Sequence, residues 1–341
     1  MGSARLKRGY RRRNKHVWVY GAGALAAVLF GMSVRPAAAP PVRVVSSSPG
    51  SLGSADADSM QGRWDITIRT PEGERPSWLQ LERSGREALV GEFVGVVGSV
   101  RPISRVEVTG DQLGFAIPRQ WEDGTGELMV EGRMQGERLA GTMTFPDGKR
   151  YDWTGVRAPA LRRSTPTWGR PVRLIDRTGL AGWHAVGGDN KWTVTNGVLR
   201  SPGSAANLVT DRTFGDFKLH VEFRYPKGSN SGVYLRGRHE VQVQDDYGAE
   251  PESHRFGGVY GFIAPSTMAA MRPDTWQSYD ITLVGRMLTV VANGRMVICN
   301  REIPGITGGA LDSNEGMPGP IMLQGDHGPV EYRNIVITPV R

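Results

Sequence analysis

Acidic, basic and amide side chains recur at alternate positions between residues 222 and 245. Glu222 and Arg224 are followed by Arg236, Glu240 and Gln242 on the polar side of an alternating pattern. A carboxylate can transfer a proton in general acid–base catalysis, and a guanidinium can stabilise a developing negative charge. This set predicts a site that moves protons on a polar, uncharged substrate. Further ionisable or amide candidates are Asp245, Gln324, Asp326 and His327.

Aromatic and amide side chains close to this set suit a carbohydrate. The C–H face of a sugar stacks on an aromatic ring, while its hydroxyl groups hydrogen-bond to amides and charged groups. Trp276 fits such a platform and fits a hydrophobic core equally well, so both interpretations stay open. The side chains expected to bind substrate are Asn230, Tyr234, Gln242, Asp245, Tyr260, Trp276 and Gln324.

The sequence contains no recognised metal-ligand spacing, phosphate-binding loop or Ser-His-Asp motif. Function therefore depends on the polar strand face itself, for which two interpretations are open. Ionisable groups buried without water or a ligand are costly, which favours an open groove that binds substrate. Alternatively, Arg236 with Glu240, and Arg224 with Glu222 or Glu240, form ion pairs on a solvated sheet.

Three consecutive strands are expected to position these side chains. Apolar and polar residues alternate with period two over residues 217–224, 231–236 and 240–245, so each strand has one apolar and one polar face. A three-residue hairpin loop over residues 237–239 places Arg236 opposite Glu240 and Tyr234 opposite Gln242. A two-residue loop would mix the faces, so we expect the longer loop.

The strands continue through residues 172–341, a segment with almost no helical periodicity. Asn293 and Gly294 mark a tight hairpin between two of them. About a dozen strands over this length favour two packed antiparallel sheets. The other main strands are expected at residues 259–263, 278–284, 287–292, 295–298, 320–324 and 330–337.

Residues 60–157 form a separate all-β segment. Turn signals every 8 to 12 residues or so predict an antiparallel meander or small barrel, and Gly62-Arg63-Trp64 is similar to the start of lipocalin-type barrels. Trp64, Trp78, Trp121 and Trp153 could line a ligand mouth, but large aromatic residues are expected in the core of a small domain. The expected strands are residues 63–70, 77–83, 88–94, 105–108, 113–118, 127–134, 138–145 and 151–156.

Residues 1–39 match the pattern of an export signal. A basic head without acidic residues precedes an apolar run over residues 17–34, and Ala37, Ala38 and Ala39 follow as small residues at a cleavage position. The alternative is an uncleaved membrane anchor over residues 17–34, near the minimum length for a spanning helix. The expected location is the periplasm or the extracellular space, with membrane contact only through this segment. Residues 40–59 and 158–171 are expected to be linkers.

The net charge of +8 comes from this N-terminal segment. Eight of the 42 Lys and Arg residues lie within residues 1–39, and the rest of the chain carries equal numbers of basic and acidic residues. Binding to nucleic acid is therefore not expected. Cys299 is the only cysteine, which excludes an internal disulfide, and we expect its side chain to be buried.

Several phrases of the C-terminal sequence resemble one bacterial family, catalogued as DUF1080 and named the 3-keto-disaccharide hydrolase domain. The resemblance covers about residues 172–340 and departs from the family at residues 176–178, where an Asn-Gly-Lys turn is usual. It implies a concanavalin A-like jelly-roll β-sandwich, so the expected fold is all-β throughout. The phrases are Asn230-Ser231-Gly232-Val233-Tyr234-Leu235-Arg236, Glu240-Val241-Gln242-Val243-Gln244-Asp245, Trp192-Thr193-Val194, Asn196-Gly197-Val198-Leu199, Glu222-Phe223-Arg224, Asn293-Gly294, Leu323-Gln324 and Arg333-Asn334-Ile335.

The resemblance implies an enzyme that acts on a glycoside or disaccharide already oxidised to a ketone at C3. The ketone acidifies the C2 proton, so a base can remove it, the enolate expels the C1 group and water adds back. Glu240 is the implied base, and Arg236 the implied stabiliser of the oxyanion. Glu222, Asp245 and His327 are implied to orient the sugar or to hold a divalent cation, and the sequence leaves the need for a metal open.

Two other functions stay open. Glu222 and Glu240 could act as the acid and base of a two-carboxylate glycoside hydrolase that needs no ketone. The sandwich could instead be a non-catalytic, lectin-like carbohydrate-binding module, because the same fold carries both functions.

Removal of residues 1–39 during export is the expected consequence of the N-terminal pattern. N-terminal sequencing of the protein recovered from the cell envelope or the medium should begin just after Ala39. A first residue at position 1 or 2 would identify a retained membrane anchor.

Overall fold

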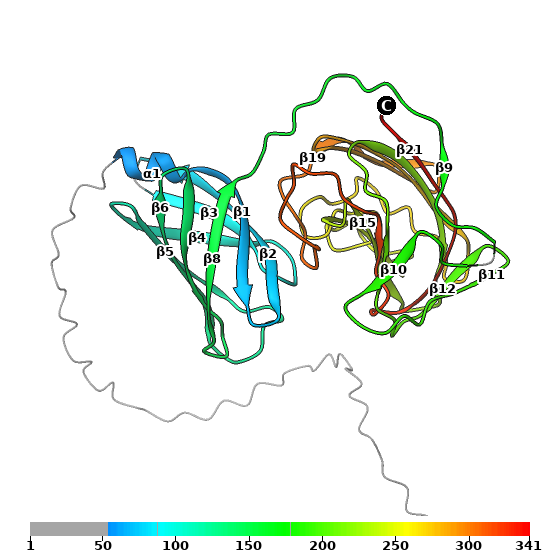
Figure 1. Ribbon diagram of the computed structural model, residues 1–341, viewed down its shortest axis with the longest axis horizontal. Helices are drawn as coiled ribbons and strands as arrows, with labels where there is room; N and C mark the ends of the chain where they lie inside the picture. The colour runs from blue at the N-terminus through cyan, green and yellow to red at the C-terminus, as the bar shows by residue number, and fades with distance from the viewer. Residues whose placement is uncertain (1–53, 87, 178) are drawn as a thin grey trace, which may run out of the picture. The chain divides into compact units, whose positions relative to one another are not determined.

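A computed structural model describes residues 54–86, 88–177 and 179–341 (Figure 1). The expected export signal and most of the first expected linker lie outside these residues. The end of that linker forms a short helix, α1 (Ser54–Met60), followed by β-strands throughout. In the part of the chain that is described, no helix is long and apolar enough to cross a membrane.

Residues 62–157 form a closed barrel of eight antiparallel strands. Each strand pairs with the next, and β1 also pairs with β8, so the barrel has no free edge. All eight predicted strands are present. Their bounds are β1 (Gly62–Thr70), β2 (Gly73–Ser84), β3 (Ala88–Val94), β4 (Arg101–Thr109), β5 (Gln112–Pro118), β6 (Glu127–Gln135), β7 (Arg138–Thr144) and β8 (Arg150–Arg157).

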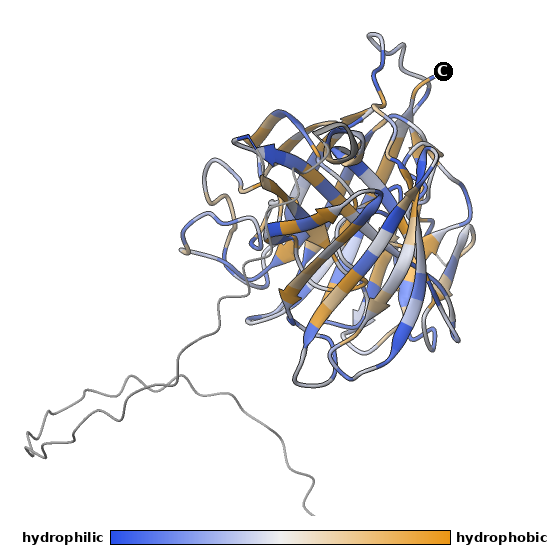
Figure 2. Cartoon of the chain, turned by 90° about the vertical axis from the view of Figure 1, so that its left-hand side faces the viewer, coloured by the Kyte–Doolittle hydropathy of each residue, from blue (hydrophilic) through white to orange (hydrophobic). Residues whose placement is uncertain are grey.

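Large side chains fill the barrel, and hydrophobic and hydrophilic residues alternate along its strands (Figure 2). The Trp153 ring lies against Gly132, where an added Cβ would come within 2.5 Å of it. Trp64, Trp78 and Trp153 are fully buried, as expected of core residues. The same expectation is wrong for Trp121, whose side chain is 72% exposed.

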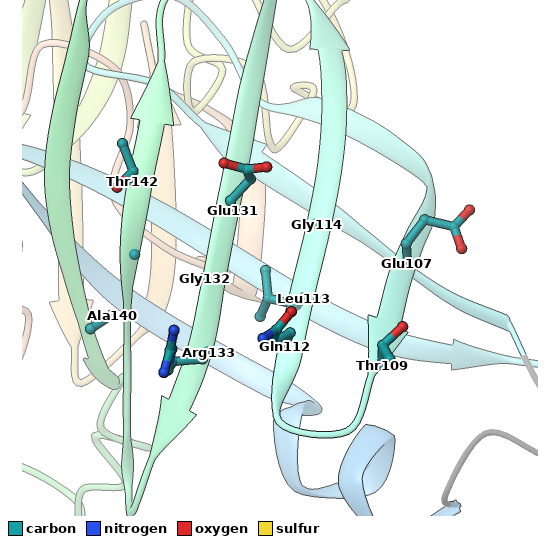
Figure 3. Close-up of a pocket in the computed structure, with 11 residues that line it drawn as sticks. Glu107, Thr109, Gln112, Leu113, Gly114, Glu131, Gly132, Arg133, Ala140 and Thr142 are labelled. Carbon is teal, nitrogen blue, oxygen red and sulfur yellow. The ribbon is translucent and has the colours of Figure 1, made fainter. Parts of the chain in front are cut away.

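A hollow of about 450 Å³ lies on the barrel strands β4 to β7 (Figure 3). It forms where Gly114, Gly132 and Gly141 carry no side chains. An added Cβ at Gly141 would lie 1.9 Å from the carbonyl oxygen of Glu131, so close strand approach accounts for this glycine. None of the predicted site residues lies in this hollow.

Residues 172–339 form two antiparallel sheets. One has the order β10-β13-β20-β15-β16, and the other has the order β11-β12-β21-β14-β17-β18-β19, with β9 paired to β21. The strands are β9 (Val172–Arg173), β10 (Trp183–Val186), β11 (Thr193–Thr195), β12 (Val198–Pro202), β13 (Asn207–Thr210), β14 (Phe217–Arg224), β15 (Asn230–Leu235), β16 (His239–Gln244), β17 (Gln277–Val284), β18 (Met287–Ala292), β19 (Arg295–Glu302), β20 (Met322–Leu323) and β21 (Pro329–Pro339).

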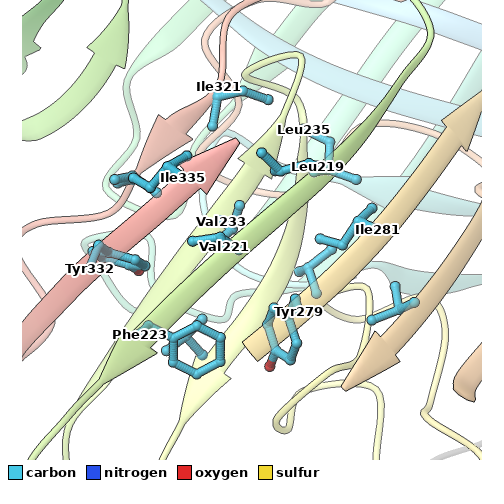
Figure 4. Packing of buried hydrophobic residues seen from close by; sticks show 14 of the residues in the cluster. Leu219, Val221, Phe223, Val233, Leu235, Tyr279, Ile281, Ile321, Tyr332 and Ile335 are labelled. Carbon is cyan, nitrogen blue, oxygen red and sulfur yellow. The ribbon is translucent and has the colours of Figure 1, made fainter. Parts of the chain in front are cut away.

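The predicted apolar faces of these strands form the sandwich core. Leu219, Val221 and Phe223 of β14 lie among Val233 and Leu235 of β15 (Figure 4). Each sheet thus contributes alternate residues to one shared layer, as expected of two packed antiparallel sheets. The predicted β-sandwich is confirmed.

The central hairpin begins one residue earlier than predicted. Its loop is residues 236–238, because Arg236 and Gly237 both adopt left-handed backbone conformations, with φ of 54° and 66°. Tyr234 therefore pairs with Glu240, and Gly232 with Gln242. The pairing of β15 with β16 is therefore shifted by two residues from the predicted one. A shift of two residues leaves each side chain on its predicted face, so the polar face of the hairpin loses only Arg236, which lies in the loop.

The predicted strand over residues 259–263 forms only isolated bridges. Gly257 and Gly261 have φ of 80° and 79°, which interrupts an extended conformation. This segment nevertheless covers the outer edge of β16. The backbone N–H of Gln242 donates to the carbonyl oxygen of Gly258 at 3.0 Å, and the backbone N–H of Tyr260 donates to the carbonyl oxygen of Glu240 at 3.1 Å.

Cys299 is exposed, so its expected burial is wrong. The register between β18 and β19 is irregular near Val290, and Val297 and Ile298 both point inward as a result. Cys299 is left on the outer side.

Barrel and sandwich belong to one compact unit. Trp78 packs against the backbone of Gly305, where an added Cβ would lie 2.3 Å from the indole, and its ring stands edge-on to Phe262 at 5.5 Å. The buried apolar cluster between them consists of Trp78, Val94, Ile306 and Ala310.

A buried arginine ties the linker between barrel and sandwich in place. Arg286 donates from Nε and Nη2 to Pro159 O at 3.1 Å and from Nη1 to Pro304 O at 3.0 Å. It also pairs with Glu315, a fully buried carboxylate. Further along, Gly169 donates to Pro339 O at 2.7 Å, so hydrogen bonds hold both ends of the expected linker.

Candidate functional site

The polar side of β15 and β16 faces a cavity of about 510 Å³. The cavity collects seven of the predicted site residues from strands and loops of the sandwich, together with three residues from barrel loops. It is lined by Val97, Gly98, Trp121, Asn230, Tyr234, Glu240, Gln242, Tyr260, Gly308, Gly309, Gln324 and His327.

Glu240 lies at the bottom of this cavity, with 4% of its surface exposed. Its backbone amide donates to Thr307 Oγ1 at 3.0 Å, and its carboxyl group contacts the Tyr234 hydroxyl. Gly232 makes room for the carboxyl group, because an added Cβ there would lie 2.2 Å from Glu240 Oε1. Burial raises the pKa of Glu240 to about 8, although the Tyr234 hydrogen bond opposes this shift.

The single proton of the Tyr234 hydroxyl faces two acceptors when Glu240 is ionised. The Tyr234 hydroxyl lies 2.9 Å from Glu240 Oε2 and 3.0 Å from the carbonyl oxygen of Gly308. A phenol carries one proton and the carbonyl only accepts, so both contacts are hydrogen bonds only if Glu240 donates to Tyr234. When Glu240 ionises, Tyr234 turns its proton to the carboxylate and the Gly308 carbonyl loses its donor, at a cost of about 1–3 kcal/mol.

Three amide side chains that line the cavity have oxygens without a hydrogen-bond partner. Asn230 Oδ1, Gln242 Oε1 and Gln324 Oε1 are buried without a hydrogen-bond partner. Their nitrogens hold some of them in place: Asn230 Nδ2 donates to Gln244 Oε1 at 3.1 Å and Gln242 Nε2 to His254 O at 3.2 Å. Three acceptors on one cavity match the hydroxyl groups of a polyol.

Tyr260 and His327 lie on the more open part of the lining. His327 Nδ1 is 2.7 Å from Asp326 Oδ1, and the imidazole is half exposed. Burial, followed by the nearby Glu240, raises the pKa of Tyr260, so its phenol stays a hydrogen-bond donor at neutral pH. Both side chains can supply a proton or a hydrogen bond to a ligand in the cavity.

The structure does not place Arg236 at the site, which corrects its predicted catalytic role. Its left-handed backbone conformation turns the guanidinium away from Glu240. The side chain is buried and donates to Gly215 O, Gly285 O and Asp216 Oδ1 at 2.7–2.9 Å. Arg236 therefore connects segments of the sandwich, and the expected ion pair with Glu240 is absent.

Glu222 lies on β14 of the other sheet and Trp276 directly precedes β17 of that sheet, so neither side chain lines the cavity. Glu222 accepts hydrogen bonds from Arg333 Nε at 2.5 Å and Asn334 Nδ2 at 2.7 Å. Trp276 lies beneath the guanidinium groups of Arg333 and Arg224, 3.9 Å and 4.9 Å from the ring centre. The period-two pattern gives the face of a strand but does not reveal which sheet contains it.

Asp245 is also outside the cavity. Its Oδ2 accepts a hydrogen bond from the Gly228 amide at 2.8 Å, which closes the turn before β15. Glu222, Asp245 and His327 are therefore not gathered as ligands of a divalent cation. Across the described ranges, no three His, Cys, Asp or Glu side chains are grouped to hold a metal ion.

The residues that sequence reasoning missed lie in loops. Thr307 and Gly308 hold Glu240 and Tyr234 through one hydroxyl and one carbonyl group, for which sequence gives no signal. Val97, Gly98 and Trp121 come from the barrel. The sequence did indicate Trp121, because it is one of the four tryptophans that could line a ligand mouth.

The sandwich matches a known family. Residues 170–338 match the model of the 3-keto-alpha-glucoside-1,2-lyase-like domain. A stretch of 89 residues is 29% identical to a 3-keto-disaccharide hydrolase of Bacteroides thetaiotaomicron. That stretch spans 23% of this chain and 30% of the relative, so less than a third of the relative's length is matched.

Solved structures show looser likenesses. A "putative glycosyl hydrolase" from Parabacteroides distasonis is 27% identical, with 52% of this chain and 91% of that chain covered and a TM-score of 0.44. The carbohydrate-binding module CBM66 from Bacillus subtilis is 12% identical, with 45% and 93% covered and a TM-score of 0.32.

Glu240→Gln is expected to be more stable than the wild type at pH 6, by about 1–3 kcal/mol, because the wild-type carboxyl group must take up on folding a proton that the unfolded chain has lost. The amide can donate to Tyr234 as the protonated carboxyl group does, and at pH 9 the gain should be larger. The folded-state pKa of Glu240 is raised, so the stability that this group contributes at low pH is lost as pH rises from the ordinary carboxyl range to about 8. Thermal unfolding at both pH values measures the difference.

Glu222→Gln is the matched control on the other sheet. Burial acts to raise the pKa of Glu222, but hydrogen bonds from Asn334 and Arg333 outweigh it and the net pKa is lowered. Ionised Glu222 therefore stabilises the folded protein at every pH above the ordinary carboxyl pKa. Glu222→Gln should lose this stability at both pH 6 and pH 9. An equal loss in Glu240→Gln would show that Glu240 is ionised in the folded protein.

Proposed function

We propose that this chain, whose sandwich belongs to the 3-keto-α-glucoside-1,2-lyase-like family, cleaves the glycosidic bond of glycosides or disaccharides that carry a ketone at C3. The observation that carries the proposal is the buried Glu240 carboxyl group with its raised pKa, in a cavity that is also lined by three amide side chains with unpaired oxygens. The N-terminal sequence pattern adds the proposal that the reaction takes place outside the cytoplasm.

Glu240 is the proposed base. A raised pKa makes its carboxylate a stronger base than an ordinary glutamate, and general base catalysis contributes about 10² to 10⁴ in rate. The C2 proton passes to Glu240, and its bonding electrons form the enolate with the C3 ketone. Without the ketone this carbon is far too weak an acid for a carboxylate, so the substrate must already be oxidised.

Departure of the C1 group completes the elimination. The enolate electrons form the C1–C2 double bond as the C1–O bond breaks, and the leaving oxygen takes a proton from His327. The Tyr260 phenol is the proposed donor to the C3 oxygen, in place of Arg236. Water then adds at C1 and C2 regains a proton, so the net reaction is hydrolysis.

The amide oxygens of Asn230, Gln242 and Gln324 are proposed to accept hydrogen bonds from the sugar hydroxyl groups. A substrate that supplies these donors regains the desolvation cost of about 1–3 kcal/mol for each buried acceptor. The two-carboxylate alternative lacks this support, because Glu222 is engaged by Arg333 and Asn334 on the other sheet.

Reaction in heavy water should place deuterium at C2 of the product sugar, because the proton removed by Glu240 exchanges with solvent. The unoxidised parent glycoside should remain uncleaved. Mass spectrometry of the products measures both outcomes. Cleavage of the parent at a comparable rate without label would support a two-carboxylate hydrolase, and binding without cleavage of either compound would support a lectin-like module.

Glu240→Gln should lower kcat/KM for a 3-keto-glycoside by about 10² to 10⁴, because the amide cannot accept the C2 proton. Wild-type kcat/KM should rise with pH through about 8, as Glu240 ionises. Glu222→Gln, assayed at a temperature where it is folded, should retain at least a tenth of wild-type activity. More than a tenth of wild-type activity in Glu240→Gln would remove Glu240 from the mechanism.

A further inference from the structure

The barrel supplies an exposed tryptophan to the cavity that contains Glu240. Trp121 lies in the β5–β6 connection, residues 119–126, and is 72% exposed. Val97 lies in the β3–β4 connection, residues 95–100, and is 44% exposed. Both line the same cavity as Glu240 and His327. Exposed apolar side chains at a polar cavity indicate a contact surface for a ligand.

The loop that carries Trp121 is held by a buried ion pair. Glu122 pairs with Arg101 at 2.7 Å, and their side chains are only 7% and 6% exposed. The second carboxylate oxygen of Glu122 accepts hydrogen bonds from the backbone amides of Gln120 and Trp121 at 2.8 Å and 3.2 Å. Trp121 is thus exposed on a braced loop, which lowers the entropy lost when it binds a ligand.

The two barrel loops are joined to each other and to the sandwich. Gln120 Nε2 donates to Ser99 Oγ at 2.9 Å, and the Ser99 amide donates back to Gln120 Oε1 at 3.0 Å. The Gly309 amide donates to Val96 O at 2.9 Å. Gly309 follows Gly308, whose carbonyl accepts from Tyr234, so a short chain of contacts connects the Trp121 loop to the Glu240 site.

The chemistry of the lining differs between its two sources. The sandwich contributes Glu240, its acid–base partners and the amide acceptors, which suit the polar edges of a sugar. The barrel contributes Trp121 and Val97, which suit the flat C–H face of a ring. A disaccharide presents both features, with the ring that undergoes the reaction at one end and the leaving ring at the other.

We infer that Trp121, with Val97 beside it, is the binding platform for the leaving-group ring, so that the barrel determines which aglycones the enzyme accepts. This inference rests on the proposed function and adds its second subsite. The expected preference is for a pyranose leaving group over a small alkoxide such as methoxide, because only the ring covers the indole. The barrel is thereby part of the substrate site.

Trp121→Ala tests the platform with two substrates, a 3-keto-disaccharide and the matching methyl 3-keto-glycoside. The variant should lose about tenfold in kcat/KM for the disaccharide, mainly through KM, and change less than twofold for the methyl glycoside. Trp121→Phe should restore part of the loss. Met129→Ala, which removes a 44% exposed barrel side chain outside the cavity lining, should leave both values unchanged. Equal losses on the two substrates, or none, would overturn the inference.

Equilibrium binding separates this inference from the proposed reaction. The full-length wild type and Trp121→Ala are titrated by calorimetry with the unoxidised disaccharide and with its methyl glycoside, neither of which is expected to be cleaved. The substitution should weaken disaccharide binding about tenfold and leave methyl glycoside binding unchanged. If no 3-keto compound is cleaved but this difference appears, the platform stands and the reaction fails. No difference in binding or turnover, with an unchanged melting temperature, would overturn the platform.

Discussion

The position of one proton, on the hydroxyl of Tyr234, connects the fold to its candidate chemistry. That proton can satisfy Gly308 or an ionised Glu240, but not both. The carbonyl of Gly308 is fixed by its own loop, so the charge state of Glu240 becomes part of the structure around it. A buried carboxyl group with one neighbouring phenol and no neighbouring guanidinium is costly to ionise, and this cost is what makes its carboxylate a strong base.

Glu240 stays buried only because both faces of β15 and β16 are covered. Their apolar side packs against the second sheet, as Val233 and Val241 show. Their polar side is covered by loops of the sandwich, which in turn pack against the barrel at Trp78. Without this second cover, Glu240 would be hydrated and its pKa would be that of a surface carboxylate. The solvated-sheet interpretation therefore does not hold for β15 and β16. It does describe β14, where Glu222 and Arg224 form partly exposed ion pairs with Arg333 and Glu331 of the neighbouring strand.

Much of this could be predicted from the sequence, because strand alternation is a local property. The eight barrel strands and the shared face of Tyr234, Glu240 and Gln242 all follow from period two. Arg236 could not be placed, because a single left-handed residue ends the alternation there. Glu222 could not be placed either, because the sheet to which β14 belongs depends on pairing between distant strands. The loop contacts of Thr307 and Gly308 leave no pattern at all.

Glycines 305 and 308 lie where barrel and sandwich backbones meet. A methyl group at Gly305 would overlap the indole of Trp78, and one at Gly308 would lie 2.1 Å from the carbonyl oxygen of Gly98. These contacts restrict the residue type only while a barrel is present. Sandwich domains that evolved without a barrel, or lost it, are therefore free to accept larger residues at these two positions.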